Sequence, residues 1–386
     1  MEWKEVRLGD IVSIKSGLAY KGAFIGKGEN ILLGMGCVSF KDKFLFSGAR
    51  PYEADCDDKY CVEPGDIVLA TRQQSDNLPI LAMPAIIPAS LKAKKIIYGT
   101  NLYKVENHSE VTNDFLFWQL KTPDYIDYIS SVKTGSVVRM VTKKNVEDYV
   151  FRCPPKEVRD RISKLLWGLD RKIELNNKIN ADLEEMAQAI FKNWFVDFEP
   201  FKDGKFVDSE LGMIPEGWKV GCLGDLITIK YGKDHKKLED GTFPVYGSGG
   251  FMRFVNSWLY DGESVLIPRK GTLDNIMYVC EKFWTVDTMF FSVPKMDYVM
   301  KYVYNYIKRF DFSKMNEGTS VPSNTAARLN KMPILIPTHE ILEMYDETLC
   351  PIYNKRKMKD KESRILSLLR DTLLPRLMSG ELEVPE

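Results

Sequence analysis

The sequence lacks any long apolar segment. Nowhere do about 18 apolar residues follow one another, and residues 1–30 are too polar for a secretory signal peptide. We therefore expect no transmembrane helix and a cytoplasmic location.

Residues that bind metals are also few. The chain has 7 cysteines and 3 histidines, and the cysteines are scattered without a CxxC pair. Only Cys56 and Cys61 lie close together, with no histidine at zinc-finger spacing. We predict no metal site and interpret the cysteines as reduced, mostly buried thiols.

Neither sign of charge is in excess. Lys and Arg total 54, as do Asp and Glu, so the net charge says nothing about a polyanionic partner and any nucleic-acid surface must be local. With 44% hydrophobic and 12% aromatic residues, the 386-residue chain can still fold into two or more domains.

Motifs of a DNA methyltransferase are missing as well. Such enzymes need a glycine-rich loop for S-adenosylmethionine and an Asn/Asp-Pro-Pro-aromatic motif for the flipped base. Pro154-Pro155 follows Cys153 and precedes Lys156, so it is better explained as a helix entry. The glycine run at residues 246–250 precedes a strand-like segment, which favours a structural turn over a cofactor loop and leaves DNA backbone contact as an alternative. We predict no catalytic residue.

The longest regular pattern runs through residues 159–195. Apolar residues recur there at alternating spacings of three and four, which is typical of a helix that winds around another helix. They are Ile162, Leu166, Leu169, Ile173, Ile179, Leu183, Met186, Ile190 and Trp194. One position is polar, Asn176, which either fixes the register of the helix pair or marks a solvated middle. The pattern ends at Glu199-Pro200, and it requires a partner helix.

The chain also contains an internal repeat. Trp3-Lys4, Leu8-Gly9-Asp10 and Gly17 reappear 215 positions later as Trp218-Lys219, Leu223-Gly224-Asp225 and Gly232. A second block, residues 64–69 with Arg72, matches residues 261–266 with Arg269. Each copy of this block predicts a tight turn followed by a short buried strand that ends near an Arg.

The third block of the repeat leads to the missing partner helix. Residues 134–154 match residues 317–337 at an offset of 183, and the same offset carries the apolar pattern of the first helix onto a later segment. A second long helix is therefore predicted at about residues 340–378, with Leu349, Ile352, Leu366, Leu369 and Leu373 at matching positions. The fall in offset from 215 to 183 makes the second globular domain about 32 residues shorter than the first.

These patterns predict an α+β fold with two globular domains in tandem repeat, separated by two long helices that form an antiparallel coiled coil. We place the domains and helices at residues 1–153 (first domain), 154–198 (first helix), 199–216 (linker), 217–337 (second domain), 338–380 (second helix) and 381–386 (tail). Short strands are expected at residues 11–14, 31–33, 67–69, 96–103, 226–229, 264–267 and 289–293, with one helix per domain near residues 114–129 and 298–309.

The doubled motifs, the segment at residues 244–250 and the two long helices together resemble the specificity (S) subunit of type I restriction-modification systems. The resemblance extends over nearly the whole chain, including the helix ends at residues 190–200 and 373–382. One departure is that Val158 and Ile341 stand where the family commonly has Gln in a P-x-x-E-Q run, so no role of that Gln is carried over.

The resemblance implies a function and a set of partners. Two target recognition domains would each read one half of a bipartite double-stranded DNA target, and the helices would set the distance between the halves. Two methyltransferase (M) subunits and restriction/motor (R) subunits would be partners, and no membrane would be involved. The resemblance implies no cofactor in this chain, because S-adenosylmethionine, ATP and magnesium would belong to the partner subunits.

Candidate DNA contacts are polar side chains in loops beside glycine or aromatic residues. Arg and Lys can bond guanine edges, Gln and Asn adenine edges, and all of them phosphate oxygens. The candidates in the first domain are Arg72, Gln73, Gln74, Asn77, Arg139, Lys143 and Lys144. Those in the second domain are Tyr246, Ser248, Arg269, Lys270, Asn275, Ser323, Asn324, Arg328 and Lys331. The alternative for each is a solvated loop, and Arg72 and Arg269 stand out because both copies place an Arg after the same strand.

Apolar residues gather where each long helix ends. They are Phe191, Trp194, Phe195 and Phe198 on the first helix, and Leu373, Leu374, Leu377 and Met378 on the second. Such patches mark subunit contacts, and the alternative is packing against the adjacent recognition domain.

The sequence therefore predicts a non-catalytic DNA-specificity subunit. The alternative is a non-catalytic α+β scaffold or an RNA-binding protein.

Overall fold

The structure is a computed structural model that describes residues 3–74, 79–312 and 323–384. It divides into two compact units, of which the first comprises Met1–Leu175 and Glu362–Glu386 and the second comprises Asn176–Lys361. Two long helices, α4 (Lys156–Phe195) and α8 (His339–Ser379), each contribute one segment to each unit. Each unit is thus one globular domain together with two helix segments.

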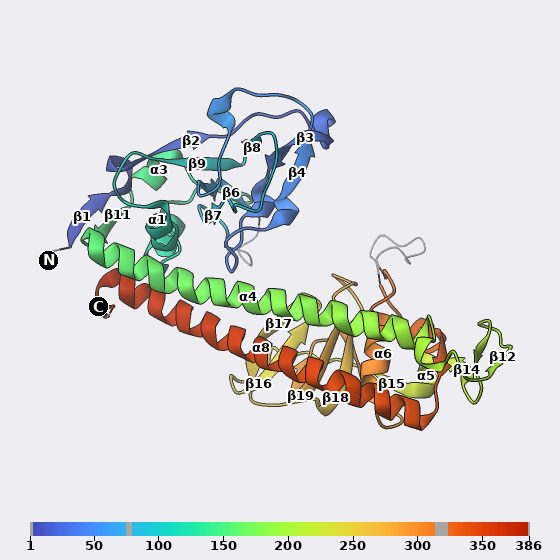
Figure 1. Cartoon of the computed structure of the whole chain (residues 1–386). Helices are drawn as coiled ribbons and strands as arrows, with labels where there is room; N and C mark the ends of the chain where they lie inside the picture. The colour runs from blue at the N-terminus through green and yellow to red at the C-terminus, as the bar shows by residue number, and fades with distance from the viewer. Residues whose placement is uncertain (1–2, 75–78, 313–322, 385–386) are drawn as a thin grey trace. The chain divides into compact units, whose positions relative to one another are not determined.

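The first domain is built on several small sheets (Figure 1). Its largest sheet has the strand order β2-β9-β5-β7, with bounds Val12–Ser16, Leu102–Asn107, Ile67–Ala70 and Pro84–Ile86. A second sheet has the order β4-β3-β8, with bounds Ala49–Tyr52, Ile25–Leu33 and Ile96–Tyr98. Two further antiparallel pairs are β1 (Lys4–Arg7) with β11 (Val150–Cys153) and β6 (Arg72–Gln73) with β10 (Arg139–Met140).

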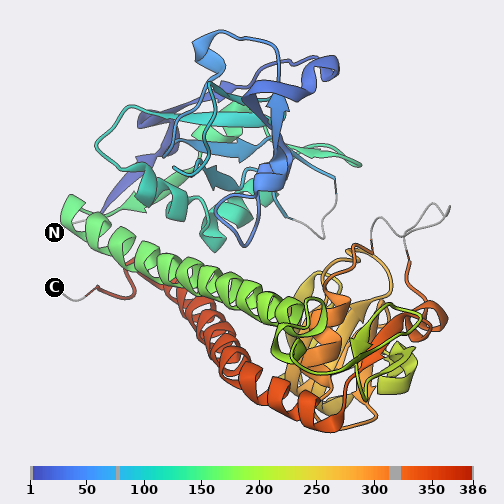
Figure 2. The same ribbon diagram turned by 45° about the vertical axis from the view of Figure 1, so that its right-hand side comes forward.

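Short helices cover the sheets of the first domain. They are α1 (Asn113–Gln119), α2 (Pro123–Val132) and α3 (Lys143–Glu147), with 3-10 turns η1 (Leu8–Asp10), η2 (Gly22–Phe24), η3 (Met35–Cys37), η4 (Phe46–Gly48) and η5 (Asp58–Tyr60). α1 lies between the sheets and α4 (Figures 1 and 2), where the rings of Phe117 and Trp167 are 5.3 Å apart. Because Ile162, Leu166 and Leu377 belong to the same buried cluster as α1, the helix segments form part of the domain's own core.

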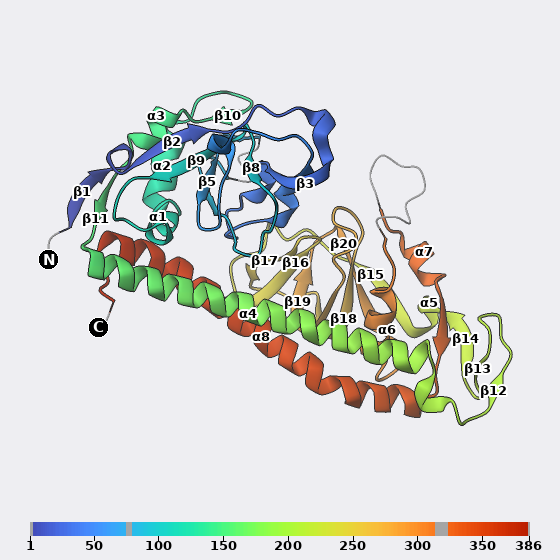
Figure 3. The ribbon, with the colours of Figure 1, turned by 45° about the horizontal axis from the view of Figure 1, so that its top comes forward.

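The second domain has one larger sheet. Its strand order is β15-β20-β18-β19-β16-β17, with bounds Ile227–Tyr231, Met289–Pro294, Tyr260–Pro268, Met277–Thr285, Phe243–Gly247 and Gly250–Val255. β14 (Lys219–Cys222) pairs with β21 (Pro333–Ile336), and β12 (Phe206–Val207) pairs with β13 (Ile214–Pro215) after η6 (Glu199–Phe201). The helices are α5 (Leu223–Leu226), α6 (Met300–Ile307) and α7 (Ala326–Asn330). α6 lies between the sheet and the long helices (Figure 3), and its side chains share their core with both of them.

The two domains repeat the same pairing of their first and last strands. β1 pairs with β11 in the register Lys4 to Cys153, and β14 pairs with β21 in the register Lys219 to Ile336, which keeps the offsets of 215 and 183. The domains differ in one strand. In the second domain β19 pairs with both β18 and β16, whereas in the first domain β7 pairs with β5 and a separate strand, β8, pairs with β3. The division of this strand into β7 and β8 leaves two sheets where the second domain has one.

The long helices are antiparallel, as predicted. Within the second unit Asn180 Nδ2 donates to Asp360 Oδ1 at 2.6 Å, and Arg356 Nη2 lies 2.5 Å from Glu184 Oε2. Residue numbers thus rise along one helix as they fall along the other. The same relation holds in the first unit, where Arg370 Nη1 donates to Asp170 Oδ1 at 2.5 Å.

The helical pattern was only partly predicted. Asn176 is fully buried, so a solvated middle at this position is wrong. Met186 and its repeat counterpart Leu369 are exposed, at 53% and 43%, although both were predicted to face the other helix. The buried face of α4 instead continues through Ala187 and Phe191, because this part of the helix packs against the second domain as well as α8.

Three local expectations within the domains are corrected. The single helix expected at residues 114–129 is two, because Pro123 starts α2 after a break at residues 120–122. The strand expected at residues 96–103 is interrupted by a turn between β8 and β9. No turn precedes the strand at residues 264–267, since Asp261 and Gly262 already lie within β18.

Candidate nucleic-acid interface

The two domains share a set of backbone hydrogen bonds at one end of their sheets. Gly17 N donates to Leu102 O at 3.2 Å in the first domain, and Gly232 N donates to Met289 O at 3.0 Å in the second. Three more bonds match in pairs. Leu18 N donates to Tyr98 O as Lys233 N donates to Thr285 O, and Thr71 N donates to Asn101 O as Arg269 N donates to Thr288 O. In the third pair, Val141 N donates to Thr71 O as Asn324 N donates to Arg269 O. We call residues 17–18, 71–73, 98–102 and 139–141 the first loop end, and residues 232–233, 247–250, 269–275, 285–289 and 323–324 the second loop end.

One glycine in each domain makes this arrangement possible. A Cβ on Gly17 would lie 2.2 Å from Gly99 O, and a Cβ on Gly232 would lie 2.0 Å from Val286 O. No side chain fits at such a distance from a backbone carbonyl. This explains why the repeat keeps glycine at both positions.

The second loop end brings together most of the predicted contacts of its domain. Lys270 and Ser323 form an isolated antiparallel bridge, and Asn275 Nδ2 donates to Ser248 O at 2.9 Å. The guanidinium of Arg269 lies over the ring of Tyr231, 5.5 Å from its centroid. Five segments that are separate in the sequence therefore meet at one surface.

The first loop end is built on the pairing of β6 with β10. Gln73 pairs with Arg139 and Arg72 with Met140, so the two arginines come from neighbouring strands. Arg72 Nε is buried and has no hydrogen-bond partner in the described part of the chain. Tyr103 lies nearby. Burial raises the pKa of its phenol above the ordinary value, although the positive charge of Arg72 partly opposes this shift.

The strand pairing corrects the predicted equivalence of Arg72 and Arg269. Ala70 pairs with Leu102 in the first domain, and Pro268 pairs with Met289 in the second. Since Leu102 and Met289 accept the matching glycine bonds, Ala70 corresponds to Pro268 and Arg72 corresponds to Lys270. The prediction was therefore wrong by one residue, which matters because adjacent residues of a strand point to opposite faces.

Three predicted contacts are buried in the domains. Gln73 is 5% exposed and its Oε1 accepts from Leu81 N, while Asn324 is 3% exposed and its Nδ2 donates to Pro268 O. Tyr246 is 4% exposed and its hydroxyl donates to Glu281 Oε1 at 2.7 Å. Their prediction as direct DNA contacts is corrected: these side chains hold the loop ends in place.

The other candidates lie at or beside the loop ends. Gln74, Lys143, Lys144, Lys270 and Lys331 are exposed, and Arg72, Arg139, Ser248, Arg269, Asn275, Ser323 and Arg328 are half-buried. The hydroxyl of Thr142 caps α3 and that of Thr325 caps α7. Lys143 and Lys144 are therefore equivalent to Ala326 and Ala327 in the repeat. Asn77 lies outside the described residues.

Two features of the second loop end were not predicted. Tyr231, 55% exposed, supports Arg269, and the turn at residues 285–289 joins the loops on either side of it. Their only signal in the sequence is an aromatic residue directly before the repeated glycine, and the first domain has Ser16 there instead.

The apolar residues at the helix ends are mostly buried. Phe191, Phe195, Leu374, Leu377 and Met378 are at most 7% exposed, while Trp194, Phe198 and Leu373 are half-buried. The first helix end packs into the core of the second domain, and the second helix end packs into the core of the first. The prediction of a subunit contact is therefore corrected for the five buried residues, because packing against a recognition domain leaves them no free surface.

Two kinds of feature are absent from the described residues. No helix there is long and apolar enough to cross a membrane. Nor do three His, Cys, Asp or Glu side chains gather there as metal ligands would.

Residues 1–185 and 215–359 match the family described as "Type I restriction modification DNA specificity domain". The chain belongs to this family. It is a DNA-specificity subunit of a type I restriction-modification system, as the sequence predicted, and the two matched regions correspond to its two repeats.

Known relatives agree with this assignment. The type I restriction enzyme MjaIX specificity subunit of Methanocaldococcus jannaschii is 26% identical over 313 residues, covering 72% of this chain and 70% of the relative. The HindI specificity subunit of Haemophilus influenzae is 22% identical over 471 aligned positions, covering 99% and 100%. A crystal structure of a type I S subunit from M. genitalium superimposes with a TM-score of 0.55 at 16% identity, covering 98% of this chain and 96% of that one, which shows the fold alone.

Proposed function

We propose that the two loop ends each read one half of a bipartite double-stranded DNA target. The observation that carries this proposal is the doubled hydrogen-bonded frame, which presents different side chains in each domain. The first loop end offers Arg72 and Arg139, and the second offers Arg269, Lys270 and Asn275. These side chains can bond base edges and phosphates, and their difference suits two unlike half-sites.

The chain serves as the recognition component of a larger assembly. Methyltransferase and restriction subunits bind it and supply the chemistry, together with S-adenosylmethionine, ATP and magnesium. This is supported by the names of the relatives, which are specificity subunits of restriction enzymes.

A binding selection tests the proposal. The purified chain, with its cognate methyltransferase subunit, is incubated with a random DNA library, and bound sequences are determined. We expect two short base patterns separated by a spacer of fixed length. A single continuous pattern, or equal binding to single-stranded RNA, would contradict the proposal.

A further inference from the structure

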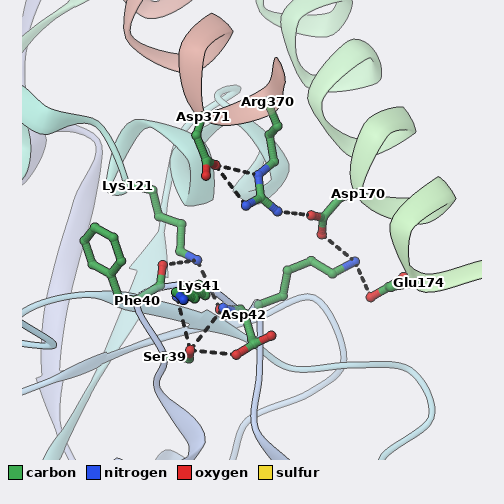
Figure 4. Close-up of polar contacts among 10 residues, drawn as sticks. Ser39, Phe40, Lys41, Asp42, Lys121, Asp170, Glu174, Arg370 and Asp371 are labelled. Carbon is green, nitrogen blue, oxygen red and sulfur yellow. Dashed lines mark hydrogen bonds and ion pairs between the residues drawn. The ribbon is translucent and has the colours of Figure 1, made fainter. Parts of the chain in front are cut away.

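Each recognition domain is joined to the long helices by a cluster of charges that is largely buried. In the first unit, Asp170 of α4 accepts from Arg370 of α8 at 2.5 Å (Figure 4). It also lies 3.2 Å from Nζ of Lys43, which belongs to the loop between η3 and η4. The side chains of these three residues are 7%, 12% and 18% exposed. We call Lys43, Asp170 and Arg370 the first clamp.

The loop that carries Lys43 is itself fixed. Lys121 Nζ donates to the carbonyls of Phe40 and Asp42 at 3.2 and 3.0 Å, and Ser39 Oγ accepts from Asp42 N (Figure 4). Lys43 Nζ also lies 2.7 Å from Glu174 on the next turn of α4 and 4.6 Å from the ring centroid of Trp167. The loop therefore presents a positioned cation to one short stretch of helix.

The second unit has a clamp built from other elements. Lys301 of α6 lies 2.7 Å from Asp346 of α8 and 3.0 Å from Glu263 of β18, and the three side chains are 3%, 12% and 32% exposed. One turn further along α6, Asn305 donates to the hydroxyls of Tyr345 and Tyr353 on α8 and accepts from Gln188 of α4 at 2.8 Å. We call Glu263, Lys301 and Asp346 the second clamp.

The clamps do not follow the repeat. At the offset of 183, Asp170 of the first helix corresponds to Tyr353 of the second, and Asp346 of the second helix corresponds to Ser163 of the first. The loop of Lys43 lies between β3 and β4, and the second domain has only a two-residue connection at the corresponding place, between β16 and β17. Apolar seam positions are shared by the two halves, but the buried charges are particular to each.

Charges and apolar contacts constrain a domain differently. Apolar packing is non-directional and tolerates rearrangement, so it alone would allow a domain to shift or rotate on its helix segments. A buried ion pair tolerates little displacement, because a shifted domain would leave a charge desolvated and without its partner. The clamps thus penalise every orientation except the one in which their charges meet.

We propose that the two clamps fix the orientation of each recognition domain on its helix segments and thereby make the chain selective for one spacer length between half-sites. This inference rests on the proposed function, since a spacer has meaning only for a bipartite target. Lys43, Asp170, Lys301 and Asp346 are positioning residues that need not touch DNA.

The decisive variant is Lys43→Met. It keeps an apolar stem beside Trp167 and leaves Asp170 paired with Arg370, so only the tie between domain and helix is removed. The matched control is Lys104→Met, because Lys104 has a similar exposure of 21% and pairs with Asp66 at 2.8 Å within the domain. Thermal unfolding of both variants establishes that they fold.

Two measurements are made on each variant. The first is specific affinity for DNA with every spacer length, where Lys43→Met should reduce the preference for the best spacer over its neighbours by roughly fivefold or more. Base preference within each half-site should stay unchanged. The second is the distance distribution between spin-labelled unnatural amino acids at the exposed positions Ser130 and Arg171 of the free protein, which should broaden.

The outcomes separate this inference from the proposed function. The clamp is supported if both the spacer preference and the spin-label distance distribution broaden in Lys43→Met but not in Lys104→Met. Unchanged profiles in Lys43→Met, or equal broadening in the control, would overturn it. If the wild-type chain selected no bipartite target, the proposed function would fail, while the distance distribution would still decide whether the clamp orients the domain. The double variant Lys301→Met/Asp346→Leu repeats the spacer assay for the second clamp, with Glu263 still accepting from the Tyr278 hydroxyl.

Discussion

Single residues at the loop ends decide which side chains can reach a ligand. Matching glycines and arginines in the sequence paired Arg72 with Arg269, but the segment from Gly262 to the end of β18 is one residue longer than the segment from Gly65 to the end of β5. Ala70 stands five positions after Gly65, and Pro268 stands six positions after Gly262. A single inserted residue exchanges the two faces of a strand, so only the pairing register identifies Lys270 as the counterpart of Arg72.

The corrected equivalence predicts the outcome of two substitutions. Arg72→Ala should relax base preference in one half-site and Lys270→Ala in the other, each weakening specific binding by about 1 to 3 kcal/mol. Competition assays with single-base variants of each half-site measure this. Relaxation of the same half-site by both substitutions would contradict the assignment, and Lys92→Ala, outside both loop ends, serves as the control.

Lys121 predicts a pH dependence of stability. Burial, and then the positive charge of Arg370, lower the pKa of its ammonium group to about 8. Between pH 8 and the unfolded pKa near 10.5 the unfolded chain binds more protons, so the Lys121 contribution to the free energy of unfolding should rise with pH in that window. Relative to Lys121→Met, the wild type should gain on the order of 2 kcal/mol from pH 7.5 to pH 10.5.

Urea unfolding of wild type and Lys121→Met at several pH values provides the measurement. The lost bonds to Phe40 O and Asp42 O add an offset to the difference, but they do not give it this slope. A difference that stayed constant or fell with rising pH would show that the Lys121 pKa is not lowered.

At the scale of elements, the repeat preserves the backbone arrangement and the helix caps, and it varies the side chains at those positions. α3 and α7 begin at equivalent threonine caps, with Thr142 accepting from Asn145 N at 3.1 Å and Thr325 accepting from Arg328 N at 3.3 Å. Yet α3 begins with two lysines and α7 with two alanines. The first two positions of these helices therefore differ by two positive charges between the domains.

This difference predicts an asymmetric salt dependence. If Lys143 and Lys144 contact phosphates, replacing both with Ala should reduce the slope of log affinity against log salt concentration by about 2, without changing base preference. Affinity measured at several salt concentrations tests this. The reverse substitution, Ala326→Lys with Ala327→Lys, is the companion variant and should steepen the slope, and unchanged slopes in both would exclude phosphate contact at these helices.

At the scale of the whole molecule, the long helices connect the two recognition domains. In the sequence, residues 175–181 of α4 lie between Asp170 and Glu184, and residues 359–365 of α8 lie between their ion-pair partners Arg356 and Arg370. Deleting both segments removes one heptad from each helix, keeps the apolar phase and leaves both pairs intact. It therefore alters helix length with little change to either domain.

We expect the preferred spacer to shorten in this deletion variant. Seven residues correspond to about 10 Å of helix, or about three base pairs of duplex DNA. Binding selections on targets with every spacer length measure the optimum. An unchanged optimum in a stably folded variant would mean that the helices do not set the spacing.

The sequence by itself determined the features that depend on local or periodic patterns. Apolar residues at spacings of three and four require a long helix with a partner, and motifs repeated at offsets of 215 and 183 require two related domains, whatever the surrounding structure. The glycines at positions 17 and 232 were visible in the sequence as part of the repeat. The reason for them was not visible: in the structure a Cβ at either position would lie about 2 Å from a backbone carbonyl oxygen.

The tertiary structure alone decided which faces are buried and which loops meet. Phe191 and Leu377 are apolar residues of the kind found at subunit contacts. They are buried in domain cores only because each helix end packs against a domain. Gln73 and Asn324 likewise have polar side chains suited to DNA, but hydrogen bonds to distant backbone groups turn them inward. Contacts between residues far apart in the chain arise from packing in three dimensions, and no spacing along the sequence encodes them.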